Sequence, residues 1–87
     1  MNGIKITYLV EFPRVGRVLY IGAETGKTAI VRVTNGSTGQ IISSKRFEDY
    51  NEALNYYSEQ YATLKTVEEF EVMRSMIEKF VGKPEGE

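Results

Sequence analysis

Residues 40–64 read QIISSKRFEDYNEALNYYSEQYATL, and the hydrophobic period of the chain changes within this stretch. Before Phe47, apolar residues occur in the short runs and alternations that are typical of β-strands. After Asp49, apolar residues recur every three or four positions, as they do on one face of a helix. These residues are Tyr50, Ala53, Leu54, Tyr57, Tyr61 and Leu64. The change predicts an α+β domain in which a sheet precedes the helices.

Four segments in the first half of the chain have the pattern of strands. They cover about residues 4–12, 17–23, 28–34 and 40–44, and turn-forming residues separate them. In the first segment, Ile6, Tyr8 and Val10 alternate with other residues, which predicts that these three side chains face the core. Because every connection is of hairpin length, we expect an antiparallel meander of three or four strands.

Two helices are predicted after the sheet, both packed on one face of it. They cover about residues 50–63 and 67–81. Asp49 followed by Glu52 is typical of a capping box and begins the first helix. Thr66 followed by Glu69 is a second signal of the same kind and begins the second helix.

The chain length and composition indicate one small domain. The chain has 87 residues, and we expect residues 1–82 to form the domain and residues 83–87 to be a flexible tail. A core of this size adds little net stability, so oligomerisation is expected. The sequence has no run of about 18 apolar residues and no signal peptide pattern, so we expect a cytoplasmic protein that does not contact a membrane.

Cysteine and histidine are both absent, which limits the chemistry of the chain. Disulfides, a thiolate nucleophile, a Cys/His zinc site and an imidazole base are all excluded. The carboxylates Glu48, Asp49 and Glu52 are interpreted as a helix start that the helix dipole favours, and not as a cation site. We therefore predict a non-catalytic protein with no metal and no cofactor.

The charges are divided between the two halves of the chain. Up to Arg46 there are seven basic residues and two acidic ones, a net charge of +5. From Phe47 onward there are four basic residues and ten acidic ones, a net charge of −6. The sequence thus predicts a basic sheet and an acidic helical layer, which the total charge of −1 conceals.

The basic residues of the first half predict a nucleic-acid-binding surface. Lys5 and Arg32 are out of phase with the predicted buried positions and should lie on the sheet face opposite the helices. A surface that collected these cations would follow a phosphate backbone. The candidates are Lys5, Arg14, Arg17, Lys27, Arg32, Lys45 and Arg46. The alternative is that they are scattered around the fold and neutralised by helix carboxylates. A sheet followed by helices is also similar in layout to Pur-type domains and integrase arm-binding domains.

A second hypothesis is a protein–protein interaction module or a small inhibitor protein, for example from a phage or mobile element, that forms a homodimer. The apolar arc of the second predicted helix covers about half of its circumference, which is more than one sheet contact requires. Tyr56 is off the apolar stripe of the first helix and should be exposed. The predicted interface residues are Tyr56, Val72, Met73 and Met76.

Overall fold

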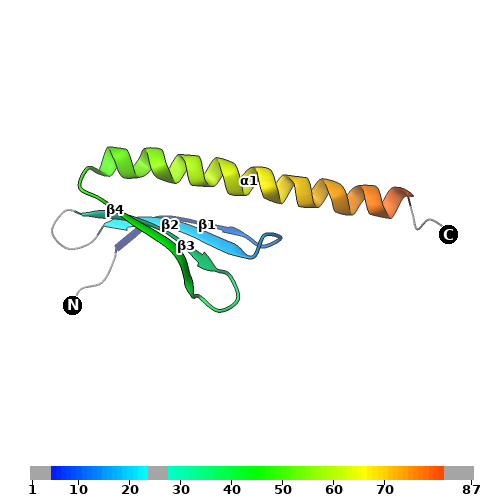
Figure 1. The fold of residues 1–87 in the computed structure, drawn as a ribbon, viewed down its shortest axis with the longest axis horizontal. Coiled ribbons are helices and arrows are strands. Elements are labelled where there is room, and N and C mark those ends of the chain that lie inside the picture. Colours follow the sequence, from blue (N-terminus) through cyan, green and yellow to red (C-terminus); the bar gives the residue numbers. More distant parts are fainter. Residues whose placement is uncertain (1–4, 24–27, 82–87) are drawn as a thin grey trace.

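The computed structural model describes residues 5–23 and 28–81. The elements are β1 (Lys5–Phe12), β2 (Arg17–Ala23), β3 (Ala29–Asn35), β4 (Ile41–Phe47) and α1 (Tyr50–Val81). The strands are antiparallel in the order β1-β2-β3-β4, which confirms the predicted α+β meander. Figure 1 shows α1 lying over one face of the sheet and extending well beyond its edge.

The last strand is longer than the sequence predicted. β4 continues to Phe47, because β3 offers backbone partners as far back as Ala29, which is opposite Phe47 in the register. Lys45 and Arg46 are therefore strand residues, and their side chains point to opposite faces of the sheet.

An irregularity in β1 changes which residues face the core. The register with β2 shifts between Ile6 and Tyr8, and one extra residue in a strand inverts the alternation of side chains. Ile6 consequently pairs with Gly22 on the face away from α1 and is 47% exposed. The prediction that Ile6 faces the core is wrong for this reason. Tyr8 stays on the helix side, where its ring lies 6.4 Å from that of Tyr57.

The core lies between the sheet and the first half of α1. Its sheet side is formed by one face of the four strands, and its helix side is closed by Ala53, which is fully buried. The ring of Phe12 meets Tyr61 edge-on, with 5.6 Å between the centroids. The buried residues of this cluster are Phe12, Leu19, Ile21, Ala29, Val31, Val33 and Ala53.

The start of the helix is capped as the sequence predicted. The Asp49 carboxylate accepts a hydrogen bond from the backbone N–H of Asn51 at 3.0 Å, and its carbonyl accepts the N–H of Ala53 at 3.1 Å. Asp49 is therefore the N-cap residue of α1, because it satisfies a backbone donor that has no partner within the helix.

One continuous helix replaces the two that the sequence predicted. The hydroxyl of Thr66 does not cap a new helix but donates to the carbonyl of Ala62 at 2.8 Å, and Thr63 donates to Glu59 in the same way at 3.0 Å. Such bonds to the preceding turn keep a threonine within a helix. The segment also contains neither Gly nor Pro, so nothing in it interrupts the helix.

The two loops at one end of the sheet are joined through glycine. The backbone N–H of Gly36 donates to the carbonyl of Gly16 at 2.9 Å, and the φ angle of Gly16 is +74°. Residues that have a side chain rarely adopt this left-handed backbone conformation. Gly16 thus allows the β1–β2 turn to reach the β3–β4 loop.

The long helix makes the molecule elongated. Its principal extents are 61 × 25 × 16 Å and its radius of gyration is 16.9 Å, whereas a compact domain of this length would have a radius of about 12 Å. The difference arises because the second half of α1 projects beyond the sheet (Figure 1).

Candidate functional site

Arg32 lies on the open face of the sheet, opposite α1. The register places Leu9, Tyr20, Arg32 and Ser44 side by side across the four strands. The Arg32 side chain donates to the Ser44 hydroxyl at 3.2 Å and to the Tyr20 hydroxyl at 3.3 Å. These bonds tie the guanidinium to both neighbouring strands, within a polar row that crosses three strands.

Arg46 is on the same face as Arg32, in the neighbouring row. It is opposite Ile30 in the register, and Ile30 is in turn opposite Gly22. Among the predicted nucleic-acid-binding residues that the structure describes, Arg32 and Arg46 therefore share the open face. Lys5 is not with them, because the β1 irregularity pairs it with Ala23 in a row that belongs to the helix side. Its predicted position on the open face is wrong.

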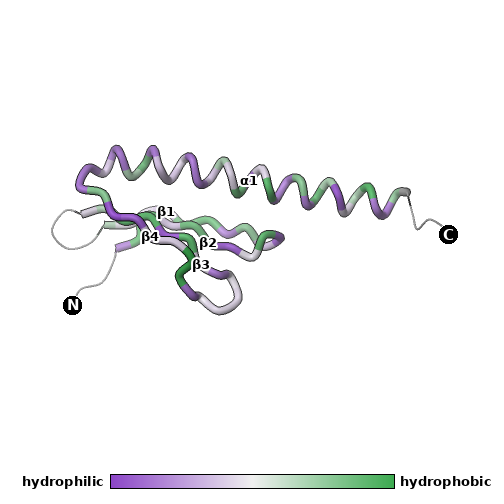
Figure 2. Tube along the Cα trace, in the orientation of Figure 1, coloured by the Kyte–Doolittle hydropathy of each residue, from purple (hydrophilic) through white to green (hydrophobic). Residues whose placement is uncertain are grey.

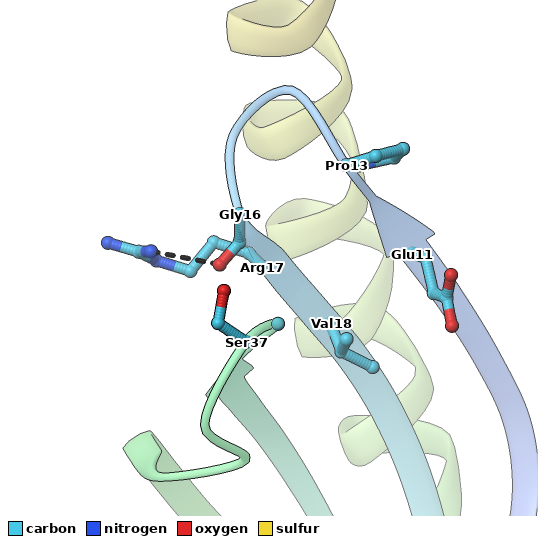
Figure 3. Close-up of a pocket in the computed structure, with 7 residues that line it drawn as sticks. Glu11, Pro13, Gly16, Arg17, Val18 and Ser37 are labelled. Carbon is cyan, nitrogen blue, oxygen red and sulfur yellow. Dashed lines mark hydrogen bonds between the residues drawn. The ribbon is translucent and has the colours of Figure 1, made fainter.

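Arg14 and Arg17 lie at the turn between β1 and β2. The Arg17 guanidinium donates to the carbonyl of Gly16 at 3.1 Å, and the backbone N–H of Arg14 donates to the Glu68 carboxylate at 3.2 Å. A cleft of about 260 Å³ beside Arg17 is lined mainly by the two loops. In Figure 3, Arg17 and Ser37 lie on one side of this cleft and Glu11 points away from them. The hydrogen bond from Arg17 to Gly16 thus stabilises the turn between β1 and β2.

Lys45 points toward α1 and not toward the open face. Its ammonium lies 5.4 Å from the ring centre of Phe47 and 5.0 Å from that of Tyr56. Tyr56 is half-buried and packs against Phe47, with 5.4 Å between the centroids. The expectation that Tyr56 is exposed is wrong, because β4 is long enough to reach its ring.

The predicted cations are therefore distributed over three places: the open face, the β1–β2 turn and the helix side. Lys27 lies outside the described residues, as does the predicted tail, residues 83–87. The sequence pattern could not show this distribution, because the faces depend on the irregularity in β1 and on the length of β4.

The projecting half of α1 carries a continuous apolar surface, which we call the distal stripe. In Figure 2, hydrophobic and hydrophilic colours recur in turn along this half of the helix. Each residue of the stripe is more than half exposed, and Phe80 is 83% exposed. The residues of the distal stripe are Phe70, Met73, Met76, Ile77 and Phe80.

The distal stripe faces away from the sheet. Successive residues of an α-helix are about 100° apart around its axis. On this scale, the centre of the distal stripe lies about 170° from the side chains of the first half that contact the sheet, such as Tyr57 and Leu64. Because α1 is continuous, this phase difference directs the stripe to the side opposite the sheet. The chain's own sheet therefore cannot cover it.

A shallow apolar groove of about 160 Å³ runs along the distal stripe. Phe70, Met73 and Ile77 line it, with Arg74 and Glu78 at its border. Of the predicted interface residues, Met73 and Met76 belong to the stripe, whereas Val72 is half-buried beside it. Phe70, Ile77 and Phe80 were missing from the predicted interface, although their spacing with Met73 marks the same helix face.

A smaller apolar area lies on the open sheet face. Ile6, Leu9 and Ile41 are each about half exposed there. They surround the polar row of Tyr20 and Arg32, so this face is mixed in character. It lacks the uniform apolar surface that the distal stripe has.

Comparison with known proteins gave no match: no family model fits the chain, and no curated protein or solved structure is significantly similar to it. Across residues 5–23 and 28–81, no helix has both the length and the apolar character needed to cross a membrane. The same described residues contain no cluster of three or more His, Cys, Asp or Glu side chains that could hold a metal ion.

Proposed function

We propose that this protein is a protein-interaction module that binds through the projecting half of α1. The observation that carries the proposal is the direction of the distal stripe, which faces away from the sheet. The largest exposed apolar patch on a monomeric protein typically covers about 300–600 Å² and is often a functional surface.

The size of the stripe supports this proposal. Phe70 and Phe80 are 60% and 83% exposed, and the two methionines and Ile77 are 53–55% exposed. Since an aromatic side chain can bury about 150–250 Å², the five residues together expose on the order of 500 Å² of apolar surface. Burial of that surface would supply much of the free energy of a modest protein–protein contact.

The shape of the stripe favours a helical or grooved partner. Its residues follow the spacing with which amphipathic helices bind an apolar groove or another helix. Methionine at two of the five positions suits such a contact, because its flexible thioether adapts to the partner's surface. The sheet then serves to anchor a rigid helical arm.

Site-specific photocrosslinking in cells that produce the protein tests this proposal. A photoreactive amino acid replaces Met73 in the stripe, and in the control it replaces Ser75, which is exposed and lies about 160° away on the helix. We expect protein adducts from position 73 and few from position 75. Equal yields at the two positions, or none at either, would contradict the proposal.

A second candidate function is nucleic-acid binding through the open sheet face. The polar row of Tyr20, Arg32 and Ser44, next to Arg46, favours it, because arginine and tyrosine are suited to phosphates and to stacked bases. Fluorescence anisotropy with labelled single strands at about 50 and 200 mM salt tests it. Binding should weaken steeply with salt and more in Arg32→Ala than in Lys65→Ala, which removes the same charge on α1. Binding that does not respond to salt would exclude this function.

A further inference from the structure

The distal stripe has the spacing of a coiled-coil seam. Phe70, Met73, Ile77 and Phe80 are separated by three, four and three residues, which is the a/d pattern of two heptads. A stripe with this spacing is complementary to an identical stripe, because the knobs of one helix fit the holes of the other.

We propose that the partner covering the distal stripe is a second copy of this chain, and that the two α1 helices pair in parallel through these four residues. This inference rests on the proposed function, since it names the partner for the same surface. It assigns Phe70 and Ile77 to the a positions and Met73 and Phe80 to the d positions.

The charges beside the seam favour this parallel arrangement. With Phe70 at an a position, Glu69 is at the g position of the preceding heptad and Arg74 is at the e position of the heptad that begins with Phe70. In a parallel pair, a g residue faces the e residue five positions later in the other helix, so Glu69 of each copy meets Arg74 of its partner. An antiparallel pair centred on the stripe would instead place Arg74 of one chain next to Arg74 of the other chain.

The ion pairs that Glu69 and Arg74 make within α1 do not prevent these residues from pairing with the other helix. Glu69 lies 3.8 Å from Lys65, and Arg74 lies 3.0 Å from Glu71. The side chains of both pairs are 39–68% exposed, and exposed pairs within a helix contribute little. A carboxylate and a guanidinium at the edge of an apolar seam can therefore turn to the partner helix at small cost.

The first half of α1 limits the length of the pairing and leaves room for both sheets. The two seam positions that precede Thr66 are the polar residues Thr63 and Glu59, and Glu59 would face Glu59 of the other copy. The two helices should therefore separate on the N-terminal side of Thr66. Because the sheet lies about 170° from the seam around the helix, the two sheets would be on the outside of the dimer.

The expected dimer is weak. With on the order of 500 Å² of apolar surface per copy, the contact is at the small end of specific interfaces, which suggests a Kd on the order of 100 µM. Sedimentation velocity over about 5 µM to 1 mM should show the weight-average mass rising from 9.9 kDa toward twice that value. Ile77→Glu should raise the Kd at least tenfold. Ser75→Glu, which adds the same charge on the opposite side of the helix, should leave the Kd within about twofold.

Single cysteines test the orientation, since the chain has none of its own. Thr66→Cys is at a d position, where a parallel pair brings the two Cα atoms within disulfide distance of about 6 Å. We expect rapid oxidation of Thr66→Cys to a covalent dimer and slow oxidation of the control, Ser75→Cys. Far-UV circular dichroism of each variant checks that the fold is retained.

Two results would overturn this inference. A wild-type chain that stays monomeric at about 1 mM, or Thr66→Cys that oxidises no faster than Ser75→Cys, would contradict the parallel homodimer. The proposed function has a separate test, because adducts of Met73 with a different protein in cells would support it even if the purified chain is monomeric. Absence of both adducts and dimer would remove the two proposals together.

Discussion

At the scale of single residues, Tyr57 couples stability to pH. Burial of its ring raises the pKa of Tyr57 above the ordinary value of 10.0, and repulsion from Tyr61, Tyr50 and Tyr8 raises it further. The unfolded chain then loses this proton at a lower pH than the folded chain does. The stability contributed by neutral Tyr57 is complete below pH 10 and is lost as the pH rises from 10 through the pKa of the folded state.

Chemical unfolding measured at pH 8 and at pH 11 checks this prediction. Wild type should lose more stability between the two values than Tyr57→Phe, because the variant lacks the ionisable hydroxyl while the other tyrosines remain. An equal loss in both chains would show that Tyr57 ionises as easily when folded as when unfolded.

Gly16 is the second residue with a predicted effect. Its φ angle of +74° is strained for a residue with a side chain, although a Cβ atom there would meet nothing within 4 Å. Gly16→Ala should therefore lower the free energy of unfolding by about 1 kcal/mol through backbone strain alone. Gly16→Asn should cost less, since asparagine tolerates this conformation. Urea denaturation of the two variants and wild type measures the difference, and equal losses would argue against strain as the cause.

At the scale of elements, alanine should lower stability at Asp49 but not at Thr66. Asp49→Ala removes the N-cap of α1 and should cost about 1 kcal/mol. Thr66→Ala lies within the helix, where alanine is the better residue by about 0.5 kcal/mol, so stability should be unchanged or slightly higher. Thermal unfolding of both variants gives the comparison. A loss of about 1 kcal/mol in Thr66→Ala would indicate that Thr66 caps a separate helix.

Most elements could be predicted from the sequence, and the failures have local causes. Alternation, turns and the cap at Asp49 were sufficient for four strands and the start of the helix. The helix boundary near Thr66 was predicted wrongly, because a Thr with a Glu three residues later has the same pattern whether its hydroxyl caps a helix or bonds to the preceding turn. Only the backbone distinguishes the two.

The candidate surfaces could be predicted less well than the fold. The excess of apolar residues after Val67 was visible in the sequence, but their direction depends on the continuity of α1. If two separate helices were present, each could turn its own stripe toward the sheet. One helix with two stripes about 170° apart cannot do so. Strand register determines in the same way that Arg32 and Arg46 share a face. It also determines that Lys45 lies against Tyr56.

At the scale of the whole molecule, stability should come from the core between the sheet and the first half of α1, and not from the projecting half of α1. Ile21 is fully buried in the core, whereas Ile77 is 55% exposed on the projecting half of α1. Ile21→Val should lower the free energy of unfolding by about 1 kcal/mol. The same exchange at Ile77 should change it by less than about 0.5 kcal/mol.

Urea denaturation at about 5 µM, where a weak dimer would be dissociated, makes this comparison one between monomers. The two substitutions remove the same methylene group, so the difference between them reports burial. Similar losses at both positions would mean that the distal stripe packs within the same chain.

The continuity of α1 determines the direction of the distal stripe, so both proposals for that surface depend on it. Spin labels at Asn55→Cys and Lys79→Cys, both exposed positions on α1, allow the distance along the helix to be measured by pulsed electron resonance. Labelled chains are diluted with unlabelled wild type so that a dimer contributes no second distance. One straight helix predicts about 36 Å between the two Cα atoms, from 1.5 Å per residue. A distance below about 20 Å would show that the chain turns back on itself near Thr66, and that α1 is not one continuous helix.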